Sequence, residues 1–251
     1  MKSGSISAER ILSRLDDYLH HNDYAAAERH LLYWLAEAEA SLDARTELLV
    51  RNELMGLYRK QGKEQEALST VFAALKKIEA LQIGHQVGAA TTYLNGATVY
   101  KAFSKAEQAL PLFEKAKEIY ERELAEGDER LGGLYNNMAL ALVDLGRFRE
   151  AEEMYHRAIT IMEKTEHGAL EVAITHLNMA SAAEAEHGLL EADAVITAHL
   201  QQAESLLEGH QKRDGYYAFV CEKCASVFGY YGYFHYENEL KERAKRIYEG
   251  A

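Results

Sequence analysis

A small residue recurs at an almost constant interval along this chain of 251 residues, and this repeat constrains the fold more than any other feature. The separations are 40, 42, 42 and 41 residues, between Ala27, Ala67, Ala109, Ala151 and Ala192. A period of this length indicates a supersecondary unit that buries its apolar face only by stacking on its neighbours. The sequence therefore predicts a repeat protein.

Other residue types keep the same interval around the alanines. Five residues before each alanine stands a turn-forming residue, at Asn22, Gly62, Ser104 and Gly146, with His187-Gly188 in the fifth unit. Four residues after it stands a large side chain, at Leu31, Val71, Phe113, Tyr155 and Ile196. Nine residues before it stand Tyr18, Tyr58, Tyr100, Leu142 and Ala183. Small side chains let two helices approach while larger ones fill the grooves beside them, so each unit is predicted to be an antiparallel helix pair.

The composition favours helices throughout the chain. One proline occurs in 251 residues, and Ala, Leu, Glu and Lys, which are strong helix formers, are abundant. Only a few polar or glycine residues separate the units, as at Gly84-His-Gln-Val-Gly88. We therefore expect an all-α fold with a single domain over residues 1–251, built from about six helix-turn-helix units. Their expected bounds are about 8–47, 48–89, 90–131, 132–172, 173–211 and 212–249.

The last unit is expected to end in a capping helix. Its predicted second helix, Glu237 to Glu249, is largely charged and is expected to bury mainly Leu240, Ala244, Ile247 and Tyr248. The end of a repeat array needs a polar outer face because no further unit covers it.

The residues that recur at fixed positions in each unit resemble the tetratricopeptide repeat, most clearly from Gly133 to Ala151. The small residue that this family places on the first helix is matched by Ala97, Ala139, Ala180 and Ala225, whereas Leu15 and Met55 depart from it. The period exceeds the usual length of about 34 residues, and this long variant is similar to the repeats of kinesin light chain. The resemblance implies a right-handed α-solenoid whose first helices line a concave groove for a protein or an extended peptide.

Asparagine repeats on the predicted first helices. Asn95, Asn137 and Asn178 share one register, and Asn52 and Asn136 stand one position earlier in their units. A side-chain amide offers both a donor and an acceptor, so it can pair with a peptide group of any sequence. The resemblance to kinesin light chain implies that these amides hold the backbone of a bound peptide. The alternative is that they bridge neighbouring helices of the solenoid.

Charged residues on the predicted groove differ between the two halves. Arg59, Lys60 and Lys101 lie in the first half, and Asp144, Glu184 and Glu222 in the second. A ligand would then place acidic groups near the first set and basic groups near the second, although a solvated mixture of charges is the alternative. The two-lysine, two-asparagine, one-arginine clamp of chaperone-binding relatives is absent from the corresponding positions, which disfavours chaperone docking.

No motif nominates an enzyme or a cofactor. No Gly-rich phosphate loop, nucleophile elbow or coupled Ser/His/Asp spacing occurs, so we predict neither catalytic residues nor a bound cofactor. The net charge of −12 disfavours nucleic acid as a partner. No apolar run is long enough to cross a membrane, and neither a signal-peptide pattern nor a disulfide framework is present. A cytoplasmic location is expected.

The pair Cys221 and Cys224 has the spacing of a redox or half-metal motif, with His235 as the nearest further ligand. The repeat template places both cysteines in the core, and a closed zinc site needs two more ligands. We therefore predict buried structural cysteines and no metal site, and keep a metal or redox protein as an alternative.

Aromatic residues concentrate near the C-terminus, from Tyr216 to Phe219 and from Phe228 to Tyr236. They favour either a well-filled terminal core or a surface for a partner or a homodimer. The sequence as a whole predicts a non-enzymatic scaffold or adaptor that binds a protein or peptide in its groove. A regulatory sensor tightened by a small signalling peptide is a further alternative.

Overall fold

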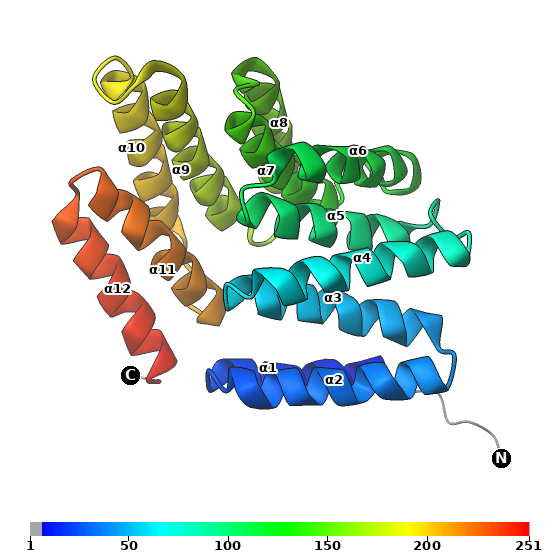
Figure 1. Ribbon diagram of the computed structural model, residues 1–251. Helices are drawn as coiled ribbons and strands as arrows, with labels where there is room; N and C mark the ends of the chain where they lie inside the picture. The colour runs from blue at the N-terminus through cyan, green and yellow to red at the C-terminus, as the bar shows by residue number, and fades with distance from the viewer. Residues whose placement is uncertain (1–6, 251) are drawn as a thin grey trace. The chain divides into compact units, whose positions relative to one another are not determined.

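The computed structural model describes residues 7–250, which form twelve α-helices and no β-strand (Figure 1). In chain order the helices are α1 (Ala8–His20), α2 (Tyr24–Ala40), α3 (Ala44–Lys60), α4 (Glu64–Ala80), α5 (Val87–Ala102), α6 (Ala106–Glu123), α7 (Glu129–Asp144), α8 (Phe148–Met162), α9 (Gly168–His187), α10 (Asp193–Gly209), α11 (Gly215–Tyr230) and α12 (Phe234–Tyr248). Each odd-numbered helix packs against the helix that follows it. The predictions of an all-α fold and of six helical hairpins are confirmed.

The corners of the hairpins lie where the turn residues predicted them. A backbone with positive φ occurs in all six corners, at Asn22, Gly62, Ser104, Gly146, Gly188 and Gly232. Glycine adopts this left-handed region without steric cost, and asparagine tolerates it better than most residues. The chain therefore reverses direction at one fixed point in each repeat.

The columns of the repeat are packing positions. The five alanines that define the period are all buried, with at most 1% of their surface exposed. The large side chains four residues later are buried as well, from Leu31 in α2 to Ile196 in α10. The second helix of each of the first four hairpins thus presents a small and a large residue, one turn apart, to its neighbours, and in the fifth hairpin the small residue, Ala192, is the N-cap of α10.

Aspartate fixes the start of several helices. Asp23, Asp43, Asp128 and Asp214 each accept a hydrogen bond from a backbone N–H in the first turn of the following helix, at 2.9 to 3.1 Å. This satisfies a donor that has no partner within the helix. The first helices α3, α5, α7 and α9 begin three to five residues before the expected repeat boundaries at 48, 90, 132 and 173. An aspartate cap fixes this start in α3 and α7.

The chain divides between Glu123 and Leu124 into two compact units of three hairpins each. In the first unit α3 contacts α2, α4 and α5, and α5 packs on α6. In the second unit α9 contacts α7, α8, α10 and α11, and α11 packs on α12. The expectation of one domain with a single right-handed superhelix stays a prediction.

Helix α12 has the character expected of a terminal cap. Leu240 and Ala244 are fully buried against the core of the second unit. Ile247 is partly buried, and the prediction that Tyr248 is buried is wrong, because 44% of its surface is exposed. Tyr248 lies in the last turn of the helix, where its hydroxyl donates to Glu222 Oε2 at 3.4 Å.

Candidate functional site

The predicted groove residues all lie on first helices. In the first unit, Asn52 on α3 donates from Nδ2 to Thr92 Oγ1 on α5 at 3.2 Å, so this amide bridges two hairpins. Its Oδ1 atom is buried and accepts no hydrogen bond from the described residues. Asn95 is half-buried on α5. Asn52 therefore combines a structural bond with an unused acceptor.

In the second unit the asparagines make bonds within the protein. Asn178 Nδ2 on α9 donates to Asn136 Oδ1 on α7 at 3.1 Å, and Asn137 Nδ2 donates to the Gly133 carbonyl of its own helix at 2.8 Å. All three side chains are half-buried. The Asn178–Asn136 bond is the inter-helix bridge that the sequence left open as an alternative to peptide binding.

The predicted charged residues have different environments. Arg59 and Lys60 are exposed at the end of α3, and the Lys60 ammonium lies 5.3 Å from the centroid of the Tyr24 ring. Lys101 is half-buried on α5, and Asp144 is exposed at the end of α7. The structure thus brings Arg59 and Lys60 together on one helix end.

Glu184, on α9, is held by two tyrosines of the next hairpin. Its Oε1 atom accepts from Tyr230 at 2.7 Å, and its Oε2 atom accepts from Tyr231 at 2.8 Å. Burial, together with the Glu184 carboxylate, raises the pKa of Tyr231 to about 12, so this hydroxyl keeps its proton at neutral pH. Glu184 consequently ties α9 to α11.

A mainly apolar cavity of about 430 Å³ lies in the first unit between α3 and α5. Leu48, Leu49 and Asn52 of α3 line it, and so do Ile83, in the connection between α4 and α5, and Ala89 of α5. The cavity has the apolar wall and the few polar groups that are typical of a site for a side chain of a ligand. It contains one of the predicted peptide-binding asparagines.

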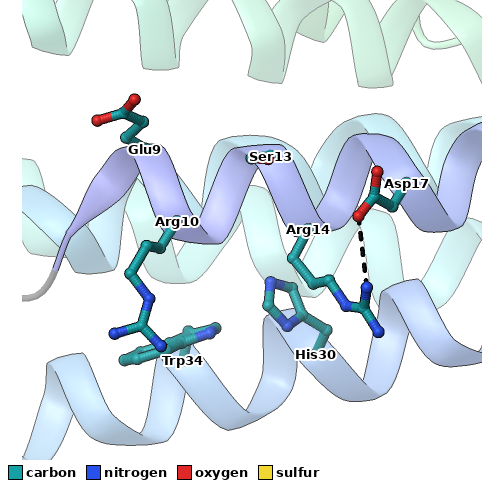
Figure 2. A pocket seen from close by; sticks show the side chains of 7 residues that line it. All are labelled: Glu9, Arg10, Ser13, Arg14, Asp17, His30 and Trp34. Atoms are coloured by element: carbon teal, nitrogen blue, oxygen red, sulfur yellow. Dashed lines mark hydrogen bonds and ion pairs between the residues drawn. The ribbon is translucent and has the colours of Figure 1, made fainter.

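A second cavity, of about 610 Å³, lies on the first hairpin. Arg10 and Arg14 extend from α1 toward His30 and Trp34 of α2, and Arg14 pairs with Asp17 at 3.4 Å (Figure 2). Our sequence reasoning missed this site, although the repeat holds a signal for it. Arg10 and Arg14 occupy registers that hold buried residues in later hairpins, such as Leu134 and Met138 in α7 and Thr175 and Met179 in α9. Charged residues at these positions therefore distinguish this hairpin from the later ones.

The two cysteines are buried, free thiols on α11. Burial raises the pKa of Cys221 to about 11 and that of Cys224 to about 12, so both are protonated at neutral pH and are poor nucleophiles. Among residues 7–250, no group of three or more His, Cys, Asp or Glu side chains is placed to hold a metal ion. None of the helices described is long and apolar enough to span a bilayer.

The aromatic C-terminal segment is largely internal. Tyr217 and Phe228 are fully buried, and the Tyr236 ring meets Phe228 edge to face, with centroids 4.7 Å apart. Arg243 of α12 donates to Glu208 Oε1 of α10 at 2.6 Å and also to the hydroxyl of Tyr217 at 3.0 Å. Phe219, Tyr230 and Phe234 are exposed. A homodimer through this end stays a prediction.

Comparison with known proteins identifies the repeat. A family model described as tetratricopeptide repeat matches residues 89–128 and 132–166, which cover α5 to α8. These two segments, which form the third and fourth hairpins, match the tetratricopeptide repeat. No curated protein sequence matches it significantly.

Two solved structures share the tetratricopeptide repeat fold over most of the chain. BtubC (BKLC) from P. vanneervenii has a TM-score of 0.67 and 22% sequence identity, over 81% of this chain and 82% of that chain. Putative kinesin light chain nearly identical TPR-like repeats from Podosopora anserina have a TM-score of 0.55 and 19% identity, over 81% of this chain and 95% of that chain. At these identities the likeness concerns the fold alone. Tetratricopeptide repeats generally serve as scaffolds for protein–protein interaction.

Proposed function

We propose that this protein is a non-enzymatic scaffold that binds an extended segment of a partner protein along the first-helix faces of its hairpins. The observation that carries the proposal is the position of Asn52 in the wall of the apolar cavity between α3 and α5, with a buried Oδ1 atom that lacks a donor. An unsatisfied buried acceptor costs about 1–3 kcal/mol, and the backbone N–H of a bound segment would satisfy it.

Neighbouring residues support a side-chain pocket beside this amide. Leu48 and Leu49 offer an apolar wall for one side chain of the segment. Arg45 also lines the cavity, and Arg59 lies two heptads further along α3 and therefore near the same face. The first unit would accordingly favour a segment that places an acidic group beside its apolar anchor.

The experiment is to select peptide ligands from a random phage-displayed library on the full-length protein and to compare variants by fluorescence anisotropy. Asn52→Leu should weaken binding of the selected peptide at least tenfold and leave the melting temperature unchanged or higher, because the orphan acceptor is removed. Asn238→Leu, at an exposed position on α12, is the matched control and should bind normally. Unchanged binding by Asn52→Leu would show that this amide has a structural role only.

A second variant tests the asparagine column itself. Joint replacement of Asn95, Asn137 and Asn178 by Ala should abolish capture of a segment that runs along the first helices. The melting temperature should change little, because the side chains are half-buried and each of Asn137 and Asn178 donates a single hydrogen bond within the protein. A large loss of stability with intact binding would assign the column to the packing of the hairpins.

A further inference from the structure

A third cavity lies in the second unit, at a position of the repeat where a small residue replaces a large one. Ala183 on α9 occupies the register of Tyr18, Tyr58, Tyr100 and Leu142 in the first four hairpins. A methyl group there leaves space that a phenol or an isobutyl group fills elsewhere, because packed neighbours relax only partly into such a gap. A cavity of about 360 Å³ lies at this position, with apolar wall residues Phe148, Tyr155, Met179, Ala182, Ala183 and Val195.

Apolar side chains are exposed in the cavity wall and at the corner of the same hairpin. Leu189 and Leu190, in the connection between α9 and α10, are 50% and 85% exposed, and Val195 of the cavity wall is 48% exposed. This connection, residues 188–192, is longer than the three-residue corner between α7 and α8. Two leucines on a longer corner next to a hollow form the kind of exposed apolar surface that marks an interaction site.

A polar group in the cavity wall also lacks a partner. The side chain of Tyr155 is 1% exposed, and its hydroxyl makes no hydrogen bond to any described residue. Burial raises its pKa well above the usual value, with a smaller effect from Asp144, so the group remains a neutral phenol. Buried hydroxyls are ordinarily satisfied, and a ligand group in the cavity would complete this one.

Charge indicates what kind of partner fits. Glu152 of α8 and Glu186 of α9 border the cavity, and no Lys or Arg does. Residues 165–211, which include all of α9 and α10, contain no Lys or Arg but eight Asp and Glu. Residues 124–251 carry 22 Asp and Glu against 12 Lys and Arg, whereas residues 1–123 carry 18 against 16. Most of the protein's net negative charge therefore lies in the unit that contains this cavity.

We propose that this cavity is a docking site for a protein segment that inserts one large apolar side chain and carries Lys or Arg on both sides of it. The apolar side chain occupies the volume that tyrosine or leucine fills in the earlier hairpins. The flanking cations lie near Glu152 and Glu186, in the field of a unit that has few cations of its own. The site uses α8, α9 and α10 and is independent of the amide at Asn52.

The test uses a fluorescein-labelled synthetic peptide with a central Phe flanked by two Lys on each side in a Gly/Ser context. Fluorescence anisotropy on the full-length protein should show saturable binding below 1 mM that weakens at least fivefold between 50 and 500 mM NaCl. Peptides with Ser in place of Phe, or with Glu in place of Lys, should each bind at least tenfold more weakly. Equal binding of all three peptides would overturn the proposal, and so would the absence of binding at 1 mM.

Variants of the cavity make the test specific. Ala183→Tyr restores the residue type of the first three hairpins, so it should fold, fill the cavity and weaken binding of the Phe peptide at least tenfold. Ala183→Leu, which copies the fourth hairpin, should act in the same direction and covers the case in which the tyrosine variant fails to fold. Ala185→Tyr, on the exposed face of α9, is the matched control and should bind normally.

Two further results would overturn the proposal. One is binding of the Phe peptide by Ala183→Tyr and Ala183→Leu with unchanged affinity. The other is a dimer in sedimentation velocity that Ala183→Tyr dissociates, because this would assign the cavity to a second copy of the chain. The Asn52→Leu experiment uses a different peptide, the one selected from the library. If Asn52→Leu binds that peptide normally, the proposed function fails, but the proposal for the cavity at Ala183 does not.

Discussion

At the scale of single residues, Glu47 shows how a buried charge is held in the first unit. Its side chain is 3% exposed on α3 and accepts from Arg51 Nε at 3.1 Å, while the ammonium of Lys77 on α4 lies 2.6 Å away. Burial alone would raise the pKa of Glu47, but the hydrogen bonds and charges of Lys77 and Arg51 together hold it below its usual value. The pairing thus stabilises the ionised carboxylate and links α3 to α4.

Replacing Glu47 by Gln should lower the free energy of unfolding at pH 7 by roughly 2–3 kcal/mol, because Lys77 and Arg51 lose their buried partner. A carboxyl with a lowered folded-state pKa stabilises the fold above its unfolded pKa and loses this effect as the pH falls through the folded one. The difference between Glu47→Gln and wild type should therefore shrink below about pH 4. Urea unfolding of both proteins at pH 7 and pH 3.5 measures this difference in the free energy of unfolding. Glu39→Gln, at a half-exposed partner of Arg51, should cost less than about 1 kcal/mol.

A histidine pair in the second unit makes the free energy of unfolding depend on pH, in a higher pH range than Glu47 does. His176 Nδ1 on α9 lies 3.1 Å from His199 Nδ1 on α10, so one ring donates and the other accepts. Burial, followed by the charges of His199 and His156, lowers the pKa of His176 to about 4. The folded state therefore keeps this ring neutral at a pH where the unfolded chain protonates it.

The unfolded state binds the additional proton between about pH 6.5 and the folded pKa of about 4, so stability should fall as the pH falls through this window. From pH 7 to pH 5 the loss from His176 should be about 1–2 kcal/mol. His176→Gln should remove this part of the pH dependence, as measured by urea unfolding at the two pH values. His235→Gln, at an exposed position, should leave the slope of wild type intact. An unchanged slope in His176→Gln would place the pH dependence elsewhere.

At the scale of helices, one small residue decides how closely a hairpin packs. Ala97, Ala139, Ala180 and Ala225 stand at the crossing of four hairpins, and the helices of these pairs approach closely along more of their length than α1 with α2 or α3 with α4. Leu15 and Met55 occupy the same position in the two looser hairpins. A larger side chain at the crossing holds the two backbones apart, and the departure from the family pattern therefore has a visible structural effect.

Ala139→Leu on α7 should therefore destabilise the protein by about 1–3 kcal/mol, because the α7–α8 crossing has no room for three further carbon atoms. Thermal unfolding followed by circular dichroism measures the change. Ala185→Leu adds the same atoms at an exposed position of α9 and should shift stability by less than about 0.5 kcal/mol. Equal stability of Ala139→Leu and wild type would mean that α7 and α8 can separate as α3 and α4 do.

The helices and corners were predictable from the sequence because each depends on a residue type at a fixed interval. The positive φ at Gly62 and Gly146 and the burial of the period-defining alanines follow from such local rules. The hydrogen-bond partners of the repeated asparagines were not predictable in this way. Whether Asn178 meets Asn136 or a ligand depends on the rotation of α9 against α7, and side-chain periodicity does not encode that rotation. The sequence shows that Ala183 replaces a tyrosine or leucine of the earlier units, but the volume of the cavity there depends on how far α8 and α10 close around it.

At the scale of the whole molecule, the acidic charge is distributed unevenly along the chain. Residues 1–123 have a net charge of −2 and residues 124–251 a net charge of −10. Charge of one sign in one unit raises the encounter rate with oppositely charged partners and makes it sensitive to salt. Basic segments should consequently reach the second unit faster than the first.

The repeat also determines the dimensions that the 251 residues should have in solution. Within each unit the contacts run mainly within a hairpin or between hairpins that are neighbours in sequence. The repeat period predicts a solenoid, and a solenoid is more extended than a globule of equal length, for which the radius of gyration is roughly 18 Å. Small-angle X-ray scattering of the monomer should therefore give a clearly larger value. A radius of about 18 Å, with the pair-distance distribution of a sphere, would show that the hairpins collapse onto a common core and would remove the open first-helix faces that peptide binding requires.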